Sequence, residues 1–316
     1  MSLVILDAAT VYPADDGRWQ AFGDVTVYDR TQTNEIVERC RDAELVLTNK
    51  VPFDAATIAA LPKLKYIGVL ATGYNIIDTA AAHKAGITVT NIPSYSTMSV
   101  AQQAISLLLA ITNRVADYAA ADADGAWCRC PDFSYRLADW HELAGKVFGI
   151  VGLGHTGAST AAIASALGMK VLAYTSKPKE ALPDGYAKAE NLEELFSAAD
   201  VLSLHCPLTP ETRGLVNERT LALMKPSAIL INTSRGPVVD ENALALALNS
   251  GNIAAAGLDV LCQEPPSEDC PLVGARNCFI TPHIAWASTE ARERLFSSAL
   301  ENVNAFRASA PVNVVI

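Results

Sequence analysis

Residues Lys146 to Gly157 read Lys-Val-Phe-Gly-Ile-Val-Gly-Leu-Gly-His-Thr-Gly. The apolar run from Val147 to Val151 predicts a buried strand, and the alanine-rich run after the last glycine predicts a helix. Gly152 permits a tight turn, Gly154 lets the backbone approach a pyrophosphate, and Gly157 allows close packing of the helix. The first N–H groups of such a helix attract an anion. A strand before the glycines and a helix after them favour a dinucleotide-binding turn over a turn with no ligand.

The alternation of short strands and helices extends in both directions from this turn. Before it, strands are expected at Leu3–Leu6, Val25–Tyr28, Leu45–Thr48, Tyr66–Leu70 and Ile87–Thr90, with helices at Asn34–Arg41, Asp54–Leu61 and Asp78–Ala85. From the turn onward, strands are expected at Val147–Val151, Lys170–Tyr174, Val201–Leu204, Ala228–Asn232, Ala255–Asp259 and Cys278–Thr281. Strands that alternate with helices predict parallel sheets.

Two domains of the α/β class are therefore predicted, each a doubly wound parallel sheet, and a length of 316 residues suits two domains. Residues 1–98 form the first, flavodoxin-like domain. Residues 99–286 form the second, a Rossmann domain that contains the glycine turn. The last helical pattern, Ser288 to Phe306, is expected to return to the first domain, so that residues 287–316 complete it.

The composition is that of a globular protein with a surplus of acid. Half of the residues are hydrophobic, and 34 Asp and Glu outnumber 24 Lys and Arg, which gives a formal net charge of −10. No basic run could follow a nucleic-acid backbone, and no apolar stretch approaches the ~20 residues of a membrane span. The segment Met1 to Asp7 lacks the pattern of a secretory signal, so a cytoplasmic location is expected. The seven scattered cysteines predict reduced thiols and no metal site.

The strand predicted at Lys170–Tyr174 ends without the acidic residue that usually binds the ribose hydroxyls in NAD-specific sites. Thr175, Ser176 and Lys177 follow it instead. No carboxylate there would repel a ribose 2′-phosphate, and Lys177 could pair with one. We therefore expect NAD or NADP as cofactor and suspect that NADP is accepted. The alternative interpretation is a solvated lysine on a surface loop.

Three further segments each follow a predicted strand of the second sheet. They carry Arg235, Glu264 and His283 within the stretches Asn-Thr-Ser-Arg-Gly, Glu-Pro and Pro-His. In a doubly wound fold the carboxyl ends of the strands border the ligand crevice, so the three side chains are expected to converge beside the cofactor. Any one of them alone would more often be an ordinary structural or surface residue.

The chain resembles the D-isomer-specific 2-hydroxyacid dehydrogenases over nearly its whole length, on the strength of these motifs and the glycine turn. The resemblance implies that Arg235 binds substrate, that His283 is the acid/base and that Glu264 pairs with it. It also implies that the first domain binds the substrate carboxylate through the loop Ala71, Thr72, Gly73 and Tyr74; the alternative is a simple turn between a strand and a helix. The expected cofactor contacts are Gly152, Leu153, Gly154, His155, Thr156, Gly157, Thr175, Ser176, Lys177, Cys206, Pro207, Thr233 and Asp259.

The chemistry of the three side chains agrees with these roles. The Arg235 guanidinium offers a rigid fork of donors to the carboxylate and keto oxygen of a 2-oxo acid. His283 could donate a proton to the oxygen as hydride arrives at the ketone carbon. A carboxylate such as Glu264 favours the charged form of a neighbouring imidazole, so reduction is expected to weaken with rising pH.

Within the family the resemblance is greatest to glycerate dehydrogenases, which reduce hydroxypyruvate. The segments that carry it are Ala71–Asn75, Ser94–Thr97, Pro131–Phe133 and His283–Trp286. The expected reaction is reversible hydride transfer between a nicotinamide cofactor and hydroxypyruvate or D-glycerate. Glyoxylate or another short 2-oxo acid is an alternative substrate. A dinucleotide-sensing, corepressor-like binding protein is the alternative from another class.

A homodimer is expected from the long helical pattern between Ser99 and about Ala121. This pattern has more apolar surface than one small domain face needs, at Val100, Ala104, Leu107, Leu108 and Ile111. The alternative is a helix that only bridges the two domains of one chain.

Overall fold

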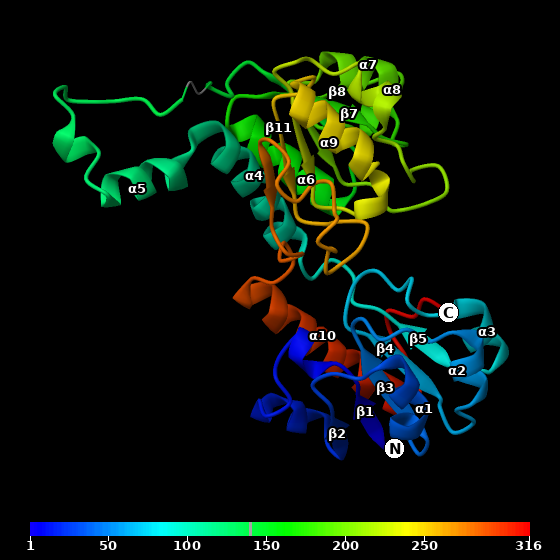
Figure 1. Ribbon diagram of the computed structural model, residues 1–316. Helices are drawn as coiled ribbons and strands as arrows, with labels where there is room; N and C mark the ends of the chain where they lie inside the picture. Colours follow the sequence, from blue (N-terminus) through cyan, green and yellow to red (C-terminus); the bar gives the residue numbers. More distant parts are fainter. Residues whose placement is uncertain (139–140) are drawn as a thin grey trace. The chain divides into compact units, whose positions relative to one another are not determined.

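The computed structural model describes residues 1–138 and 141–316 and divides into two compact units. One unit comprises Met1–Ser96 and Ala287–Ile316, and the other comprises Thr97–Trp286 (Figure 1). Each unit contains one parallel sheet with helices packed on it, so the predicted class of two doubly wound α/β domains is confirmed.

The first unit has five parallel strands in the order β2-β1-β3-β4-β5, which is the order of flavodoxin-like folds. The strands are β1 (Leu3–Ile5), β2 (Val25–Val27), β3 (Leu45–Thr48), β4 (Tyr66–Val69) and β5 (Thr88–Thr90). The helices are α1 (Ile36–Cys40), α2 (Ala55–Ala59), α3 (Thr79–Lys84) and α10 (Thr289–Arg307), with 3-10 turns η1 (Ala8–Thr10), η2 (Gly17–Phe22) and η3 (Thr33–Glu35). Every strand predicted here is present, with ends that differ by at most one residue.

Short polar side chains begin the helices of this unit. The Asp54 carboxylate accepts a hydrogen bond from the Thr57 N–H at 2.8 Å, and Asp78 accepts one from the Ala81 N–H at 2.9 Å. These caps satisfy N–H groups that have no partner within the helix. Gly86, with φ +71°, follows the end of α3, where the left-handed conformation favours glycine.

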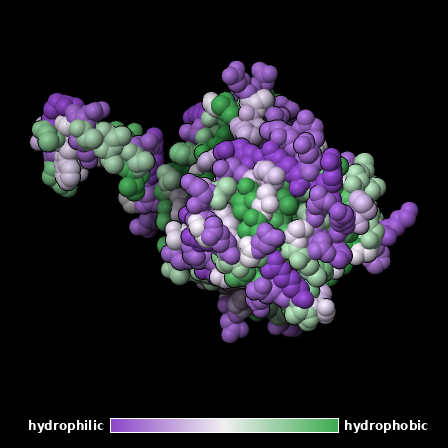
Figure 2. All heavy atoms as spheres, turned by 90° about the horizontal axis from the view of Figure 1, so that it is seen from below, coloured by the Kyte–Doolittle hydropathy of each residue, from purple (hydrophilic) through white to green (hydrophobic). Residues whose placement is uncertain are grey.

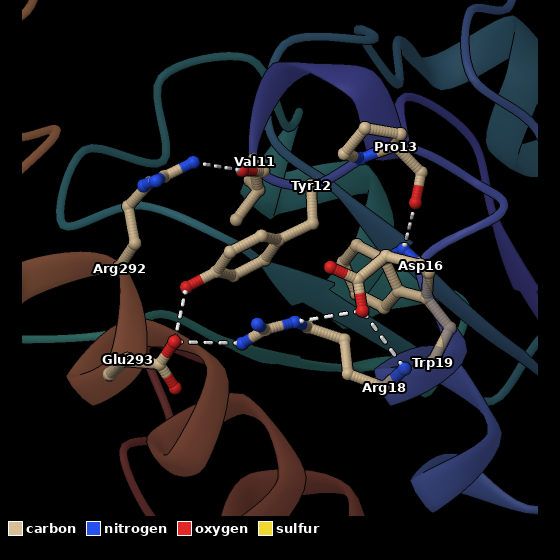
Figure 3. Close-up of polar contacts among 8 residues, drawn as sticks. All are labelled: Val11, Tyr12, Pro13, Asp16, Arg18, Trp19, Arg292 and Glu293. Carbon is tan, nitrogen blue, oxygen red and sulfur yellow. Dashed lines mark hydrogen bonds and ion pairs between the residues drawn. The ribbon is translucent and has the colours of Figure 1, made fainter. Parts of the chain in front are cut away.

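The helix α10 is joined to the segment after β1 by a polar network (Figure 3). The Tyr12 hydroxyl donates a hydrogen bond to Glu293 Oε1 at 3.0 Å, and Arg18 Nη1 reaches the same oxygen at 3.0 Å. The Arg18 guanidinium lies 3.6 Å from the centroid of the Tyr12 ring. Behind this network, the Trp19 and Phe296 rings pack edge to face with centroids 5.7 Å apart. These contacts fix α10 to the unit that contains the first five strands.

The second unit has seven parallel strands in the order β12-β11-β10-β9-β6-β7-β8. The strands are β6 (Val147–Val151), β7 (Lys170–Tyr174), β8 (Ala187–Lys188), β9 (Val201–Leu204), β10 (Ile229–Asn232), β11 (Ala255–Leu258) and β12 (Cys278–Ile280). Six of them were predicted; β8 was not, because two residues show no periodicity. The order of connection reverses between β6 and β9, which is where doubly wound folds bind their ligands.

Helices cover both faces of the second unit's sheet (Figure 1). The helices of this unit are α4 (Thr97–Asn113), α5 (Val115–Ala123), α6 (His155–Ala166), α7 (Leu192–Ala198), α8 (Glu218–Leu221) and α9 (Glu241–Ser250), with 3-10 turns η4 (Trp127–Arg129), η5 (Lys179–Ala181) and η6 (Gly236–Val238). The side chains of α4 and α6 share one apolar core with the sheet, and those of α7 and α9 lie in another.

The single helix predicted from Ser99 to Ala121 is in fact two helices. Arg114 adopts the left-handed conformation, with φ +53°, and separates α4 from α5. Ala104, Leu107 and Leu108 are buried in the core of their own unit, so the apolar surface on which the predicted dimer rested is already covered. No residue of α5 is buried, and this helix extends away from the sheet as an arm (Figures 1 and 2).

Candidate active site

The glycine turn joins β6 to α6, and its three glycines meet different constraints. Gly152 has φ +89°, and a Cβ there would lie 2.8 Å from the His205 carbonyl oxygen. A Cβ on Gly157 would lie only 2.1 Å from the Gly152 carbonyl oxygen. By contrast, no described atom other than those of its chain neighbours lies within 4 Å of a Cβ placed on Gly154. The fold therefore requires Gly152 and Gly157, whereas the absence of a side chain at Gly154 keeps space open.

That open space adjoins the start of α6. Gly154 is the N-cap residue and supplies no side-chain hydrogen bond to the helix, and the first turn contains no acidic residue. The partial positive charge of the helix end is therefore not neutralised by the chain's own carboxylates. Leu153, His155 and Thr156 complete the turn, so the six residues predicted to hold a pyrophosphate form one continuous segment. This geometry fits an anionic dinucleotide.

The segment after β9 packs against the glycine turn. A Cβ on Gly152 would be 3.0 Å from the Cys206 backbone nitrogen, which places the predicted Cys206–Pro207 segment beside the turn. His205 precedes it, and its Nε2 lies 2.8 Å from Ser203 Oγ. Burial lowers the pKa of His205 to about 4, so the imidazole is neutral at physiological pH. His205 was not among the residues predicted from sequence, because only the fold brings it under the glycines.

Thr233 follows β10 and provides a second test of the cofactor site. Its side chain is buried, and its hydroxyl oxygen has no hydrogen-bond partner among the described residues. An unsatisfied buried hydroxyl is unfavourable by about 1–3 kcal/mol, so such groups usually have a partner. The Thr233 hydroxyl therefore fits a bound polar group at the edge of the sheet where the glycine turn also lies, because β6, β9 and β10 are parallel.

The end of β7 carries the three residues considered for the adenosine ribose. The Lys177 N–H donates to Thr175 Oγ1 at 3.3 Å, and the Lys188 ammonium donates to the Lys177 carbonyl at 2.6 Å. Ser176, which lies between Thr175 and Lys177 in the chain, is exposed. Lys188, on β8, therefore adds a second cation to this strand end, which the sequence alone did not place there.

Arg235 is positioned by a buried asparagine at the end of β10. Asn232 is buried, and its Nδ2 donates to the Arg235 carbonyl at 3.0 Å. Its Oδ1 accepts from the Ser234 N–H at 2.9 Å and from the Ser234 hydroxyl at 2.8 Å. Asn232 therefore closes the turn that carries the guanidinium, which is partly exposed.

The loop after β11 packs directly on the Arg235 turn. A Cβ on Gly236 would lie 2.0 Å from the Leu261 carbonyl carbon, so only glycine fits between the two backbones. The Leu261 N–H in turn donates to Glu264 Oε1 at 3.0 Å. The Arg235 turn and the Glu264 loop are therefore in backbone contact at Gly236 and Leu261, and the hydrogen bond from Leu261 fixes Glu264 within its own loop.

His283 and Glu264 form a pair. His283 Nδ1 lies 2.6 Å from Glu264 Oε2, and both side chains remain partly exposed. Because Nδ1 faces the carboxylate, Nε2 is the ring nitrogen left for a substrate. The structure therefore brings Glu264 and His283 into direct contact and connects Arg235 to them through Gly236 and Leu261.

Asp259 holds the backbone of the His283 turn. It is 1% exposed, and its carboxylate accepts from the Thr281 hydroxyl at 2.6 Å, the Ile284 N–H at 3.0 Å and the Ala285 N–H at 2.8 Å. Burial raises the pKa of Asp259, and these hydrogen bonds oppose that rise. The backbone of His283 has φ +52°, a conformation that residues other than glycine rarely adopt. The hydrogen bonds that Asp259 accepts from the Ile284 and Ala285 N–H groups hold the turn in this conformation. The sequence predicted that Asp259 contacts the cofactor. The structure shows in addition that its carboxylate holds the His283 turn by hydrogen bonds.

The predicted substrate loop lies in the first unit, after β4. The Ala71 carbonyl accepts from the Ile92 N–H at 3.0 Å, and the Thr72 carbonyl accepts from Asn91 Nδ2 at 2.7 Å. The N–H groups of Thr72 and Gly73 donate to no described residue. The peptide groups are thus oriented with their carbonyls occupied and their N–H groups available to an anion.

Among residues 1–138 and 141–316, no three His, Cys, Asp or Glu side chains come together as metal ligands. No helix in those ranges has the length and apolar character to cross a membrane.

Comparison with known proteins places these features in a family. Residues 105–285 match the family model described as D-isomer specific 2-hydroxyacid dehydrogenase, NAD binding domain. The whole chain is 46% identical to a hydroxypyruvate reductase of Blautia hydrogenotrophica and covers 99% of it. Over 91% of its length it is 44% identical to a glycerate dehydrogenase of Methylorubrum extorquens, of which 90% is covered.

A solved structure gives the same result at the level of the fold. The acyclic imino acid reductase Bsp5, in complex with NADPH and D-Arg, superposes with a TM-score of 0.87 at 30% identity, with all of both chains covered. The chain therefore belongs to the D-isomer specific 2-hydroxyacid dehydrogenase family and is an oxidoreductase with a nicotinamide-dinucleotide-binding domain.

Proposed function

We propose that this enzyme reduces hydroxypyruvate to D-glycerate, reversibly, with a nicotinamide cofactor. The hydrogen bond between His283 and Glu264, joined through the Leu261 backbone to the Arg235 turn, is the observation that carries this proposal. The two curated relatives described above are named for hydroxypyruvate and for glycerate, which supports this choice among 2-oxo acids.

The nicotinamide cofactor, when bound, supplies the hydride for the ketone carbon. Arg235 binds the substrate carboxylate and polarises the keto oxygen through its planar fork of donors. His283 Nε2 donates a proton to that oxygen, because Nδ1 is engaged by Glu264. Proton transfer by a positioned side chain typically contributes 10²–10⁴-fold to a rate. Glu264 keeps the imidazole oriented through its hydrogen bond with Nδ1.

The remaining assignments follow from the same proposal. Residues 99–286 act as the dinucleotide-binding domain, with the glycine turn, Cys206–Pro207 and Thr233 at the cofactor. Residues 1–98, with 287–316, act as the substrate-binding domain, and the Thr72 and Gly73 N–H groups bind the substrate carboxylate. Asp259 lies near the nicotinamide carboxamide in addition to holding the His283 turn.

A panel of short 2-oxo acids tests the proposed substrate. Initial rates are measured at the nicotinamide absorbance band with hydroxypyruvate, glyoxylate, pyruvate and oxaloacetate, each with NADH and with NADPH. The expected result is the highest kcat/KM with hydroxypyruvate. A higher kcat/KM with glyoxylate would replace hydroxypyruvate as the substrate, and no turnover of any of the four would refute the proposed reaction.

We further propose that the enzyme accepts NADP. Support comes from the end of β7, where Lys177 and Lys188 lie together and no described carboxylate pairs with either. A ribose 2′-phosphate would find two cations and the Thr175 and Ser176 hydroxyls there. Replacing Lys177 by Asp is expected to lower kcat/KM with NADPH at least about tenfold relative to NADH. Equal changes for both cofactors would refute this assignment.

A homodimer is proposed on the arm formed by α5 and the segment that follows it, residues 115–138. The arm exposes three large apolar side chains, with Val115 68%, Trp127 57% and Phe133 91% exposed. A second copy of the chain could cover them, because a twofold axis supplies each arm with a matching surface. Light scattering after size-exclusion chromatography should give twice the chain mass; the mass of one chain would refute the dimer.

A further inference from the structure

The substrate loop after β4 lies against the residues that follow β5, the neighbouring strand of the same sheet. The Ala71 carbonyl accepts a hydrogen bond from the Ile92 N–H at 3.0 Å, and the Thr72 carbonyl accepts one from Asn91 Nδ2 at 2.7 Å. The Thr72 hydroxyl donates in turn to the Ile92 carbonyl at 2.9 Å. Residues 91–92 therefore fix two consecutive peptide groups of the loop from one side.

The direction of each carbonyl determines the direction of the N–H in the same peptide group. Both peptides are trans, and in a planar trans peptide the carbonyl and the N–H point to opposite sides. Both carbonyls face residues 91–92, so the N–H groups of Thr72 and Gly73 face away from them, and neither donates to a described residue. Two neighbouring N–H groups turned to the same side form a site for an anion. The Asn91 amide thereby sets the direction of the Gly73 N–H.

Both backbone polar groups of Asn91 have partners of their own. Its N–H donates to the Asn313 carbonyl at 3.2 Å, and its carbonyl accepts from Asn302 Nδ2 at 2.9 Å. Asn302, on α10, is 2% exposed, and its Oδ1 accepts from Asn313 Nδ2 at 2.8 Å. The segment after α10 continues beside the edge strand β5 through an antiparallel bridge between Thr90 and Val314 (Figure 1). Three asparagines therefore form one hydrogen-bonded chain that ends at the substrate loop.

Stability alone does not require the last bond of this chain. The hydrogen bond from Asn91 to the Thr72 carbonyl is exposed, and water can satisfy an exposed carbonyl as well as an amide can. What the Asn91 amide adds is a fixed direction for the peptide group. A site whose donors are already aligned binds more tightly, because less conformational freedom is lost on binding.

We propose that Asn91 is a positioning residue for the substrate carboxylate, supported by Asn302 and Asn313. It aligns the Thr72 and Gly73 N–H groups and does not touch the substrate itself. The inference rests on the proposed function, in which these N–H groups bind the carboxylate of hydroxypyruvate.

Steady-state kinetics with hydroxypyruvate and direct binding of oxamate test this assignment. Oxamate has the carboxylate of a 2-oxo acid but an amide in place of the ketone, so it is not reduced. Its Kd is measured by calorimetry on enzyme loaded with reduced cofactor. We expect Asn91→Ala to raise both KM and the oxamate Kd about tenfold, a factor that corresponds to about 1.4 kcal/mol. The loss should fall mainly on KM rather than kcat, because the carboxylate is bound in the ground state and in the transition state alike.

Ser2→Ala is the matched control. The Ser2 hydroxyl also donates an exposed hydrogen bond to a backbone carbonyl, that of Asp42 at 2.6 Å, but it lies just before β1, at the opposite edge of the same sheet. This variant should change neither KM nor the oxamate Kd.

Asn313→Gly tests the support of Asn91. It removes the side chain that bonds Asn302, and glycine readily adopts the φ of +53° found at this position. We expect it to raise KM about threefold by itself and to add little in the Asn91→Ala background, since the two residues act through one contact. It also provides the same test if Asn91→Ala does not fold.

Urea unfolding shows which variants are folded, and the kinetic pattern then decides. An unchanged KM and oxamate Kd in folded Asn91→Ala would overturn the inference. An equal rise of KM in Ser2→Ala would do the same, as would a fall in kcat at constant KM in Asn91→Ala. If wild type neither reduces a 2-oxo acid nor binds oxamate, the proposed function fails, and the inference fails with it.

Discussion

Gly154 and Gly157 lie three residues apart, and alanine at the two positions should have opposite consequences. At Gly154 the backbone has φ −73° and ψ −164°, which alanine adopts readily, and a Cβ has open space around it. Replacing glycine by alanine in a compatible conformation stabilises a protein by about 0.4–1 kcal/mol. We therefore expect Gly154→Ala to unfold at an equal or slightly higher temperature, while its affinity for the cofactor falls at least about tenfold, because the new methyl group occupies the space beside the helix N–H groups.

At Gly157 the same substitution should damage the fold. Its Cβ would lie 2.1 Å from the Gly152 carbonyl oxygen, so α6 or the turn must move by about 1 Å to reach ordinary contact. Overpacking of this kind destabilises by about 1–3 kcal/mol. Urea unfolding and titration of cofactor fluorescence, performed on both variants, separate the two effects. Unchanged cofactor affinity in Gly154→Ala would refute the assignment of this turn, and unchanged stability in Gly157→Ala would refute the packing argument.

Three more predictions concern side chains of the second unit. Asp259→Asn should lower kcat at least about tenfold, because an amide cannot accept all three of the hydrogen bonds that hold the His283 turn. The control variant Thr281→Ser keeps the hydroxyl, so its kcat should stay near that of wild type. A wild-type kcat in Asp259→Asn would refute the role of Asp259 in holding this turn. The pKa of His205 is lowered from 6.5 to about 4, so between these two pH values the unfolded chain binds a proton that the folded chain does not. The free energy of unfolding should therefore fall by up to about 3 kcal/mol as the pH is lowered from 6.5 to 4. In His205→Gln the free energy of unfolding should fall less over the same pH range. An equal loss in both proteins would rule out His205 as the cause. Arg235→Ala should raise KM and lower kcat, whereas His283→Ala should chiefly lower kcat; the reverse pattern in steady-state kinetics would exchange the two roles.

The strands were predictable because burial on both faces of a parallel sheet leaves a nearly continuous apolar run. Val147–Val151, Lys170–Tyr174 and Val201–Leu204 have the same bounds in the sequence prediction and in the structure. The break at Arg114 was not predictable, since neither Gly nor Pro marks it and a residue other than glycine rarely adopts the left-handed conformation found there.

The site was predictable in part, for a related reason. Motif residues such as Arg235 and Glu264 follow strands and so were expected at one edge of the sheet. The residues that orient them were not, because their contacts join positions far apart in the chain: Asp259 reaches Ala285, 26 residues on, and His205 lies against the glycine turn. Only the folded chain brings such partners together.

A single-turnover experiment tests the central claim most directly. Enzyme in excess over reduced cofactor is mixed rapidly with hydroxypyruvate, and the loss of nicotinamide absorbance is followed for wild type and for His283→Ala, with cofactor affinity measured beside it. In wild type we expect rapid oxidation of the reduced cofactor, with D-glycerate as the product. In His283→Ala we expect the rate of cofactor oxidation to be lower by about 10²–10⁴-fold at unchanged cofactor affinity. Equal rates in the two proteins would show that the proton comes from elsewhere and would contradict the account.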